Sequence, residues 1–258
     1  MADARPLPAA GPLLVINGVS PRLTVLLGRP GRETLVRENA ATGHAAAVLA
    51  PMVADILTAA GLAPADLAGI ACVRGPGSFT GIRVALATAL GLSLATGAPM
   101  AGLEYLPLLA ASAARHATGA VIAVTHARNG QVYLQPFLAD GDLVPMGPPE
   151  ALFLDAAAAR VAEGAAVGPL TLVGDGATRH RAALLRAAPL AAIPGDGDQP
   201  DPDTVLKLAR QAAYGPGQVE PLYLRPSDAE ENLATLAAGR GLSPETARTM
   251  LKDAVTRE

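Results

Sequence analysis

The sequence predicts an α/β fold in which two β-β-β-α-β-α units follow one another, each with a mixed sheet. Two observations carry this prediction. The same order of short apolar runs and helical patterns occurs in both halves of the chain, with little identity between them. In each half, three meandering runs precede a strand–helix–strand crossover, which places parallel strands beside antiparallel ones and helices on both faces of the sheet.

The first half begins with the apolar run 13–17, which ends at Asn-Gly and has the length of a buried strand. A helical apolar spacing follows Thr42, a candidate N-cap, and stops at Gly61, a candidate C-terminal glycine. We expect strands over residues 13–17, 23–27, 33–36, 68–73 and 99–103, and helices over 44–60, 82–96 and 106–116.

The second half repeats this pattern. We expect strands over residues 120–125, 131–138, 143–146 and 170–174, and helices over 151–163, 178–187 and 203–214. Duplicated in this way, the architecture is shared by actin, hexokinase and the Hsp70 ATPase domain (the ASKHA fold), and likeness of fold alone does not fix function. The expected domains are a disordered extension over 1–12, a first subdomain over 13–103, a second over 104–219, and a tail over 220–258 whose helix packs back on the body.

Composition excludes several classes of protein. The 258 residues are half apolar, and 20 basic against 23 acidic residues give a net charge of −3, which argues against a surface that binds nucleic acid throughout. A single cysteine, Cys72, excludes a disulfide framework and a cysteine zinc site. No two of the four histidines are four residues apart, which excludes a two-histidine metal site on one helix face. We therefore expect no metal, and we expect His180, between two arginines, on a solvated face.

The stretch 84–103 is uncharged and long enough to cross a bilayer. It contains glycine, serine, threonine and proline, and much of the rest is alanine. This composition favours a buried helix followed by a turn and a strand. We expect a cytoplasmic protein without a membrane segment.

The densest motif joins a predicted strand to a predicted helix. It comprises Arg74, Gly75, Pro76, Gly77, Ser78, Phe79, Thr80, Gly81, Ile82 and Arg83. Ser78 or Thr80 is a candidate cap, and a helix N-terminus with arginines nearby is suited to an anion or a nucleotide. A tight turn without a ligand explains the same residues. The motif is not a Walker A loop, because no Gly-Lys-Ser/Thr follows.

This motif and the Ala-rich helix after it resemble the TsaB family, also called YeaZ. Three further segments agree with that family. They are His44 with the helix start that it precedes, 127–133 (Ala-Arg-Asn-Gly-Gln-Val-Tyr) and 221–225 (Pro-Leu-Tyr-Leu-Arg). The resemblance spans residues 13–226.

The resemblance implies a non-catalytic subunit that binds and supports a TsaD-type transferase. That enzyme forms N6-threonylcarbamoyladenosine next to the anticodon of tRNAs that read ANN codons. It also implies a TsaE-type ATPase in the complex, a homodimer when the partner is absent, and contact with tRNA only through the complex. No intrinsic cofactor is expected, since ATP or ADP and metal belong to the partner subunits. The implied interface consists of His44, Val48, Leu49, Met52, Val53, Ile56, Val84, Ala87, Leu90 and Leu94.

Two positions depart from the family pattern. The first strand ends in Asn17, where the family has aspartate, and His126 replaces an aspartate ahead of Ala-Arg. In kinases and ATPases of this fold an aspartate at the first of these turns helps to hold magnesium and phosphate. Asn17 lacks that charge, so autonomous ATP hydrolysis becomes less favoured.

Two other functions stay open. An autonomous nucleotide-binding kinase or ATPase of the same fold would use 17–18, 74–83 and 175–176 around a phosphate. A tRNA-binding module is disfavoured by the acidic balance and by the scarcity of aromatic residues, seven in all.

Overall fold

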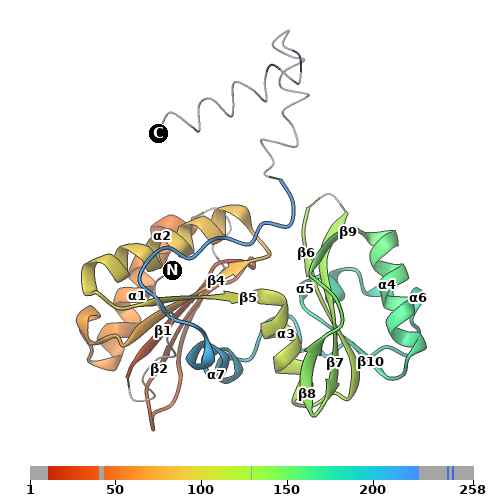
Figure 1. The fold of residues 1–258 in the computed structure, drawn as a ribbon, viewed down its shortest axis with the longest axis horizontal. Helices are drawn as coiled ribbons and strands as arrows, with labels where there is room; N and C mark the ends of the chain where they lie inside the picture. Colours follow the sequence, from red (N-terminus) through yellow and green to blue (C-terminus); the bar gives the residue numbers. More distant parts are fainter. Residues whose placement is uncertain (1–10, 41–43, 129, 227–242, 244–245, 247–258) are drawn as a thin grey trace. The chain divides into compact units, whose positions relative to one another are not determined.

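The computed structural model describes residues 11–40, 44–128, 130–226, 243 and 246 (Figure 1). The chain divides into one compact unit up to Leu224 and a second from Arg225 onward, and every element below belongs to the first. The candidate cap Thr42, most of the predicted N-terminal extension and most of the predicted tail lie outside the described residues.

The first sheet has the strand order β3-β2-β1-β4-β5. Its strands are β1 (Leu13–Asn17), β2 (Leu23–Gly28), β3 (Leu35–Asn39), β4 (Gly69–Gly75) and β5 (Met100–Glu104). Strand β1 is antiparallel to β2 and parallel to β4, which is the mixed sheet that the sequence predicts. Strands β1 and β4 are apolar along almost their whole length because helices cover both faces, with α1 (Ala45–Ala60) and α2 (Phe79–Thr96) on one and α7 (Pro202–Gln211) on the other.

The second sheet is built on β10-β6-β7. Its strands are β6 (Gly119–His126), β7 (Gln131–Asp140), β8 (Asp142–Pro145), β9 (Glu150–Phe153) and β10 (Leu170–Val173). Strands β8 and β9 pair with opposite ends of the long β7. An isolated parallel bridge between Thr171 and Ala192 takes the place that β5 has in the first sheet. The predicted fold class, two repeated units with mixed sheets, is confirmed.

Two predicted helices of the second half differ from the structure. The predicted helix 151–163 begins as β9, and α4 (Leu154–Ala166) starts only after it, because Leu152 pairs with Val132 of β7. The predicted helix 178–187 is instead α5 (Asp175–Arg179) and α6 (Arg181–Ala187), interrupted at His180. In the first case, pairing across the sheet overrides the local helical pattern.

The last helix of each half crosses to the other half. Helix α3 (Tyr105–Ala114) follows β5 but packs mainly on β6, β7 and β10. Helix α7 comes from the second half but packs on β1 and β2, and the two helices contact each other. The chain therefore ties its two sheets together through a pair of exchanged helices.

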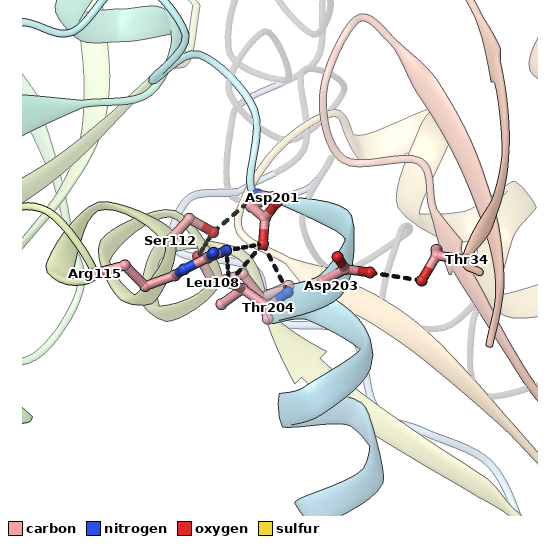
Figure 2. Close-up of polar contacts among 7 residues, drawn as sticks. All are labelled: Thr34, Leu108, Ser112, Arg115, Asp201, Asp203 and Thr204. Carbon is pink, nitrogen blue, oxygen red and sulfur yellow. Dashed lines mark hydrogen bonds and ion pairs between the residues drawn. The ribbon is translucent and has the colours of Figure 1, made fainter. Parts of the chain in front are cut away.

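The N-terminus of α7 is held from two sides (Figure 2). The Asp201 carboxylate accepts hydrogen bonds from the Thr204 amide at 2.9 Å and, at 2.6 Å, from Arg115, which directly follows α3. On the other side, Thr34 donates to Asp203 at 2.6 Å. Burial favours the protonated form of Asp201, but hydrogen bonds from Thr204 and Arg115 outweigh it, so the pKa of Asp201 lies below its ordinary 3.8.

Replacing Asp201 with alanine should lower the free energy of unfolding by about 1 kcal/mol, because the helix loses its N-cap. Asp201→Asn keeps a capping oxygen and isolates the contribution of the charge. A carboxylate with a lowered pKa stabilises the fold above its ordinary pKa of 3.8 and loses this effect as the pH falls through the lowered value. The free energies of unfolding in urea should therefore differ between wild type and Asp201→Asn near neutral pH and converge in acid. Equal separation at both pH values would contradict the assignment.

Candidate functional site

The glycine motif lies where β4 turns into α2, as the sequence predicts. The Ser78 hydroxyl accepts a hydrogen bond from the Gly81 amide at 3.2 Å, so Ser78 is the N-cap of α2. The Ser78 amide in turn donates to the Val19 carbonyl at 2.7 Å. These two amides of the motif are therefore used within the chain.

The glycines of the motif are explained by close approach of the backbone. A methyl group added at Gly81 would lie 1.9 Å from the carbonyl oxygen of Gly18, and one at Gly77 would lie 2.3 Å from that of Val19. Both partners belong to the turn between β1 and β2. No side chain fits at such distances, so the motif and this turn require glycine where they meet.

A third segment completes this contact. The residues 219–224, here called the strap, run from the β5 side of the sheet to the motif (Figure 1). The Leu222 amide donates to the Arg74 carbonyl at 2.7 Å. Gly75 has φ +131°, and a methyl group there would lie 2.4 Å from the Leu222 carbonyl oxygen. We call the meeting point of the β1–β2 turn, the motif and the strap the glycine junction.

An aromatic cluster joins the strap to the first turn of α2. The rings of Phe79 and Tyr223 stack with centroids 4.3 Å apart. The guanidinium of Arg83 lies 4.0 Å from the centre of the Phe79 ring, and its Nε donates to the Tyr223 hydroxyl at 3.2 Å. Arg74 forms an ion pair with Glu104. Sequence analysis did not select Tyr223 as a site residue, although the family-like segment 221–225 contains it.

A separate cavity of about 690 Å³ lies between the first sheet, α3 and the loop before α7. Its polar lining includes Asn17, Glu38, Arg115, His116 and Asp196. Of the three segments that an autonomous kinase would bring to a phosphate, only the first reaches this cavity, through Asn17. Residues 74–83 and 175–176 do not line it. The side chain of Asn17 accepts a hydrogen bond from the Val19 amide at 3.1 Å.

The predicted interface residues fall into two groups. Three of them belong to the buried core side of α1 and are at most 4% exposed: Leu49, Val53 and Ile56. This part of the prediction is therefore wrong. Helical spacing groups residues onto one face, and here that face packs on the sheet. The remaining predicted residues are exposed or half-buried: His44, Val48, Met52, Val84, Ala87, Leu90 and Leu94.

Helix α2 is long and apolar enough to cross a membrane, by length and composition only, and 28% of this stretch is buried in the protein. Its inner side packs on β4 and α1. Its outer side carries Ala87, Gly91 and Leu94, and Leu94 is 78% exposed. The result is an apolar helix surface that the described residues of the first unit leave open.

Two histidines that are far apart in sequence meet at the end of β6. The rings of His126 and His180 lie 5.8 Å apart, and both residues are half-buried, so the expectation of a solvated His180 is wrong. Burial, and then the Arg179 guanidinium, lower the pKa of both histidines below 6.5, while Asp175 opposes this. Among the described residues no group of three metal-binding side chains is found.

Comparison with known proteins agrees with the resemblance seen in the sequence. Residues 35–151 match the family described as TsaD, tRNA N6-adenosine threonylcarbamoyltransferase. The chain is 36% identical over 129 residues to the tRNA threonylcarbamoyladenosine biosynthesis protein TsaB of Escherichia coli K12, which covers 50% of this chain and 55% of that protein. In structure it matches YeaZ from Pseudomonas aeruginosa with a TM-score of 0.67 and 26% identity.

The chain is similar to TsaB (YeaZ) in sequence and in structure. The match to the Pseudomonas YeaZ structure covers 83% of this chain and 100% of that one. In sequence, the chain spans about half the length of the curated TsaB proteins it matches, 55% and 52% for two of them. A stretch of 72 residues is also 46% identical to the tRNA N6-adenosine threonylcarbamoyltransferase of Maricaulis maris, covering 28% of this chain and 19% of that enzyme.

The glycine junction predicts a sharp contrast between two glycines of the same helix. Gly81→Ala places a methyl group against the backbone of Gly18 and should cost about 1–3 kcal/mol of stability, as overpacking does. Gly91→Ala meets nothing within 4 Å and should stabilise the helix by about 0.5–1 kcal/mol. Denaturant unfolding measures both. A Gly81→Ala variant as stable as Gly91→Ala would show that the junction is not tightly closed.

The histidine pair predicts a loss of stability in mild acid. Groups with a lowered pKa favour the folded state above 6.5 and lose this contribution as the pH falls through their lowered pKa values. As the pH falls from neutral to mildly acidic, the unfolding temperature should therefore decrease less steeply for a His126→Asn/His180→Asn variant than for wild type. The exposed His116, changed to Asn, serves as the control. Identical slopes for wild type and the double variant would refute the prediction.

Proposed function

We propose that the chain is a non-catalytic subunit that binds and supports a TsaD-type threonylcarbamoyltransferase in forming N6-threonylcarbamoyladenosine in tRNA. The outer face of α1 and α2, here called the docking face, is the surface that meets the partner. The names of the relatives, TsaB and tRNA N6-adenosine threonylcarbamoyltransferase, support the pathway. The properties of the docking face support the role as a subunit.

The observation that carries the proposal is an exposed, almost uncharged surface of small residues. Helix α1 has one charged residue, Asp55, which pairs with Arg37, and α2 has one, Arg83. Alanines and Gly91 let another pair of helices approach closely. Surfaces with large apolar areas and few charges are typical of binding sites for other proteins.

The expected partner has a similar surface. Both helices of the docking face lie within the residues that match the TsaD family. Related folds carry related helix pairs, so a face that pairs with its own copy also suits a homologue through a pseudo-twofold contact. We therefore propose a complex with a TsaD-type subunit, and a homodimer when that subunit is absent.

The finer parts of the proposal follow from the same role. Catalysis, ATP or ADP, and metal belong to partner subunits, including a TsaE-type ATPase, and this chain has no cofactor of its own. The tRNAs, those that read ANN codons, contact the chain only through the complex. All of this takes place in the cytoplasm, where tRNA is modified.

The test is complex formation with the TsaD-type protein of the same organism, measured by size-exclusion chromatography with light scattering. Leu94→Glu or Ala87→Glu buries an unpaired charge in the interface and should weaken the complex on the order of 100-fold. Leu190→Glu is the matched control, because Leu190 is 98% exposed and lies outside α1 and α2. The core residues Leu49 and Ile56 are unsuitable, since their variants would fail to fold.

If the wild-type chain forms no complex at micromolar concentrations, the proposal is wrong. ATP binding and hydrolysis by the chain alone would then test the alternative, an autonomous nucleotide-binding kinase or ATPase. Loss of binding in both Leu94→Glu and Leu190→Glu would place the interface elsewhere.

A further inference from the structure

The docking face has a single charge that no described residue of the chain neutralises. Arg83 is the one charged residue among the eighteen of α2, and it is exposed. It lies one helical turn before Ala87 and on the same stripe as Leu90 and Leu94, because residues three or four apart share a helix face. The charge therefore stands at the N-terminal end of the apolar stripe.

The guanidinium of Arg83 is held in a fixed position. The Phe79 ring lies under it at 4.0 Å, the Tyr223 ring centre lies 6.0 Å away, and the Tyr223 hydroxyl accepts from Nε. The strap holds Tyr223 through the bond of Leu222 to the Arg74 carbonyl. Between the described residues, no hydrogen bond or ion pair occupies Nη1 or Nη2 of Arg83.

We infer that Arg83 is the polar anchor of the docking face and binds a carboxylate of the TsaD-type partner. This inference rests on the function proposed above. An arginine that stacks on an aromatic ring keeps its planar edge free, and that edge matches the two oxygens of a carboxylate. Because Phe79 and Tyr223 order the side chain in advance, little conformational entropy is lost on binding.

The position of Arg83 favours an acidic side chain over other occupants. A cation at an apolar interface must be paired once water is excluded, or it opposes binding. The docking face cannot supply the pair, since its other charge, Asp55, already binds Arg37. Since no described carboxylate of the chain pairs with Arg83, the proposed partner supplies the negative group. The strap then has a role in binding without needing to contact the partner itself, because it positions Arg83 through Tyr223.

The experiment measures the affinity of the full chain for the TsaD-type protein by calorimetry at several salt concentrations. Arg83→Gln should weaken binding by about 10- to 100-fold, as loss of an arginine hot spot does, and should reduce the salt dependence. Arg83→Lys keeps the charge but not the planar edge and should recover only part of the affinity. Tyr223→Phe keeps the ring stack, loses the hydroxyl, and should weaken binding about 2- to 10-fold. Arg186→Gln, at an exposed arginine of α6, is the matched control.

Charge exchange identifies the partner group. Arg83→Glu should abolish binding, and one Asp→Arg or Glu→Arg change on the paired helices of the partner should restore it. If wild type binds the partner and Arg83→Gln binds it equally well, the inference that Arg83 is an anchor would be wrong. The proposed function would be unaffected. If Arg83→Gln weakens binding but no charge exchange restores it, the inference that the partner group is a carboxylate would be wrong. No binding by wild type would overturn both proposals, and thermal unfolding of each variant separates these results from misfolding.

Discussion

The close backbone contact at the glycine junction is the constraint on which the first half of the molecule depends. Gly81 meets Gly18, and Gly75 meets Leu222, at distances that exclude any side chain. The strand β1, the helix α2 and the strap are therefore fixed to one another at a single point. Since α2 begins in this junction, its direction over the sheet is set there, and with it the side of the helix that stays exposed.

This use of glycine separates two roles that look alike in a sequence. A glycine-rich turn before a helix serves either to admit a phosphate or to admit another part of the backbone. Here the backbone partners of Gly75, Gly77 and Gly81 are present within the chain. The anion site stays a prediction, but the glycines are accounted for without it. In this arrangement the motif shapes the surface of α2 and the cluster around Arg83.

The sequence predicted the features that depend on local patterns. The apolar runs of β1 and β4, the cap Ser78 and the terminal glycine Gly61 all lie within a few neighbouring residues. Features that depend on residues far away in the chain could not be predicted from the sequence. Strand β9 exists because it pairs with β7, and Tyr223 meets Phe79 across more than a hundred residues. Helical periodicity grouped Leu49 with Ile56 correctly but could not say that the sheet covers that face.

The departure at Asn17 follows from the same junction. Its side-chain oxygen accepts from the Val19 amide, and the Val19 carbonyl accepts from the Ser78 amide at the start of α2. Asn17 is 6% exposed, so an aspartate there would have to bury a charge, whereas the neutral amide makes the same hydrogen bond without that cost. The residue that in kinases of this fold helps to hold a metal and phosphate is in this chain part of the link between β1 and α2. A position suited to catalysis thereby supports the surface that we propose as the docking face.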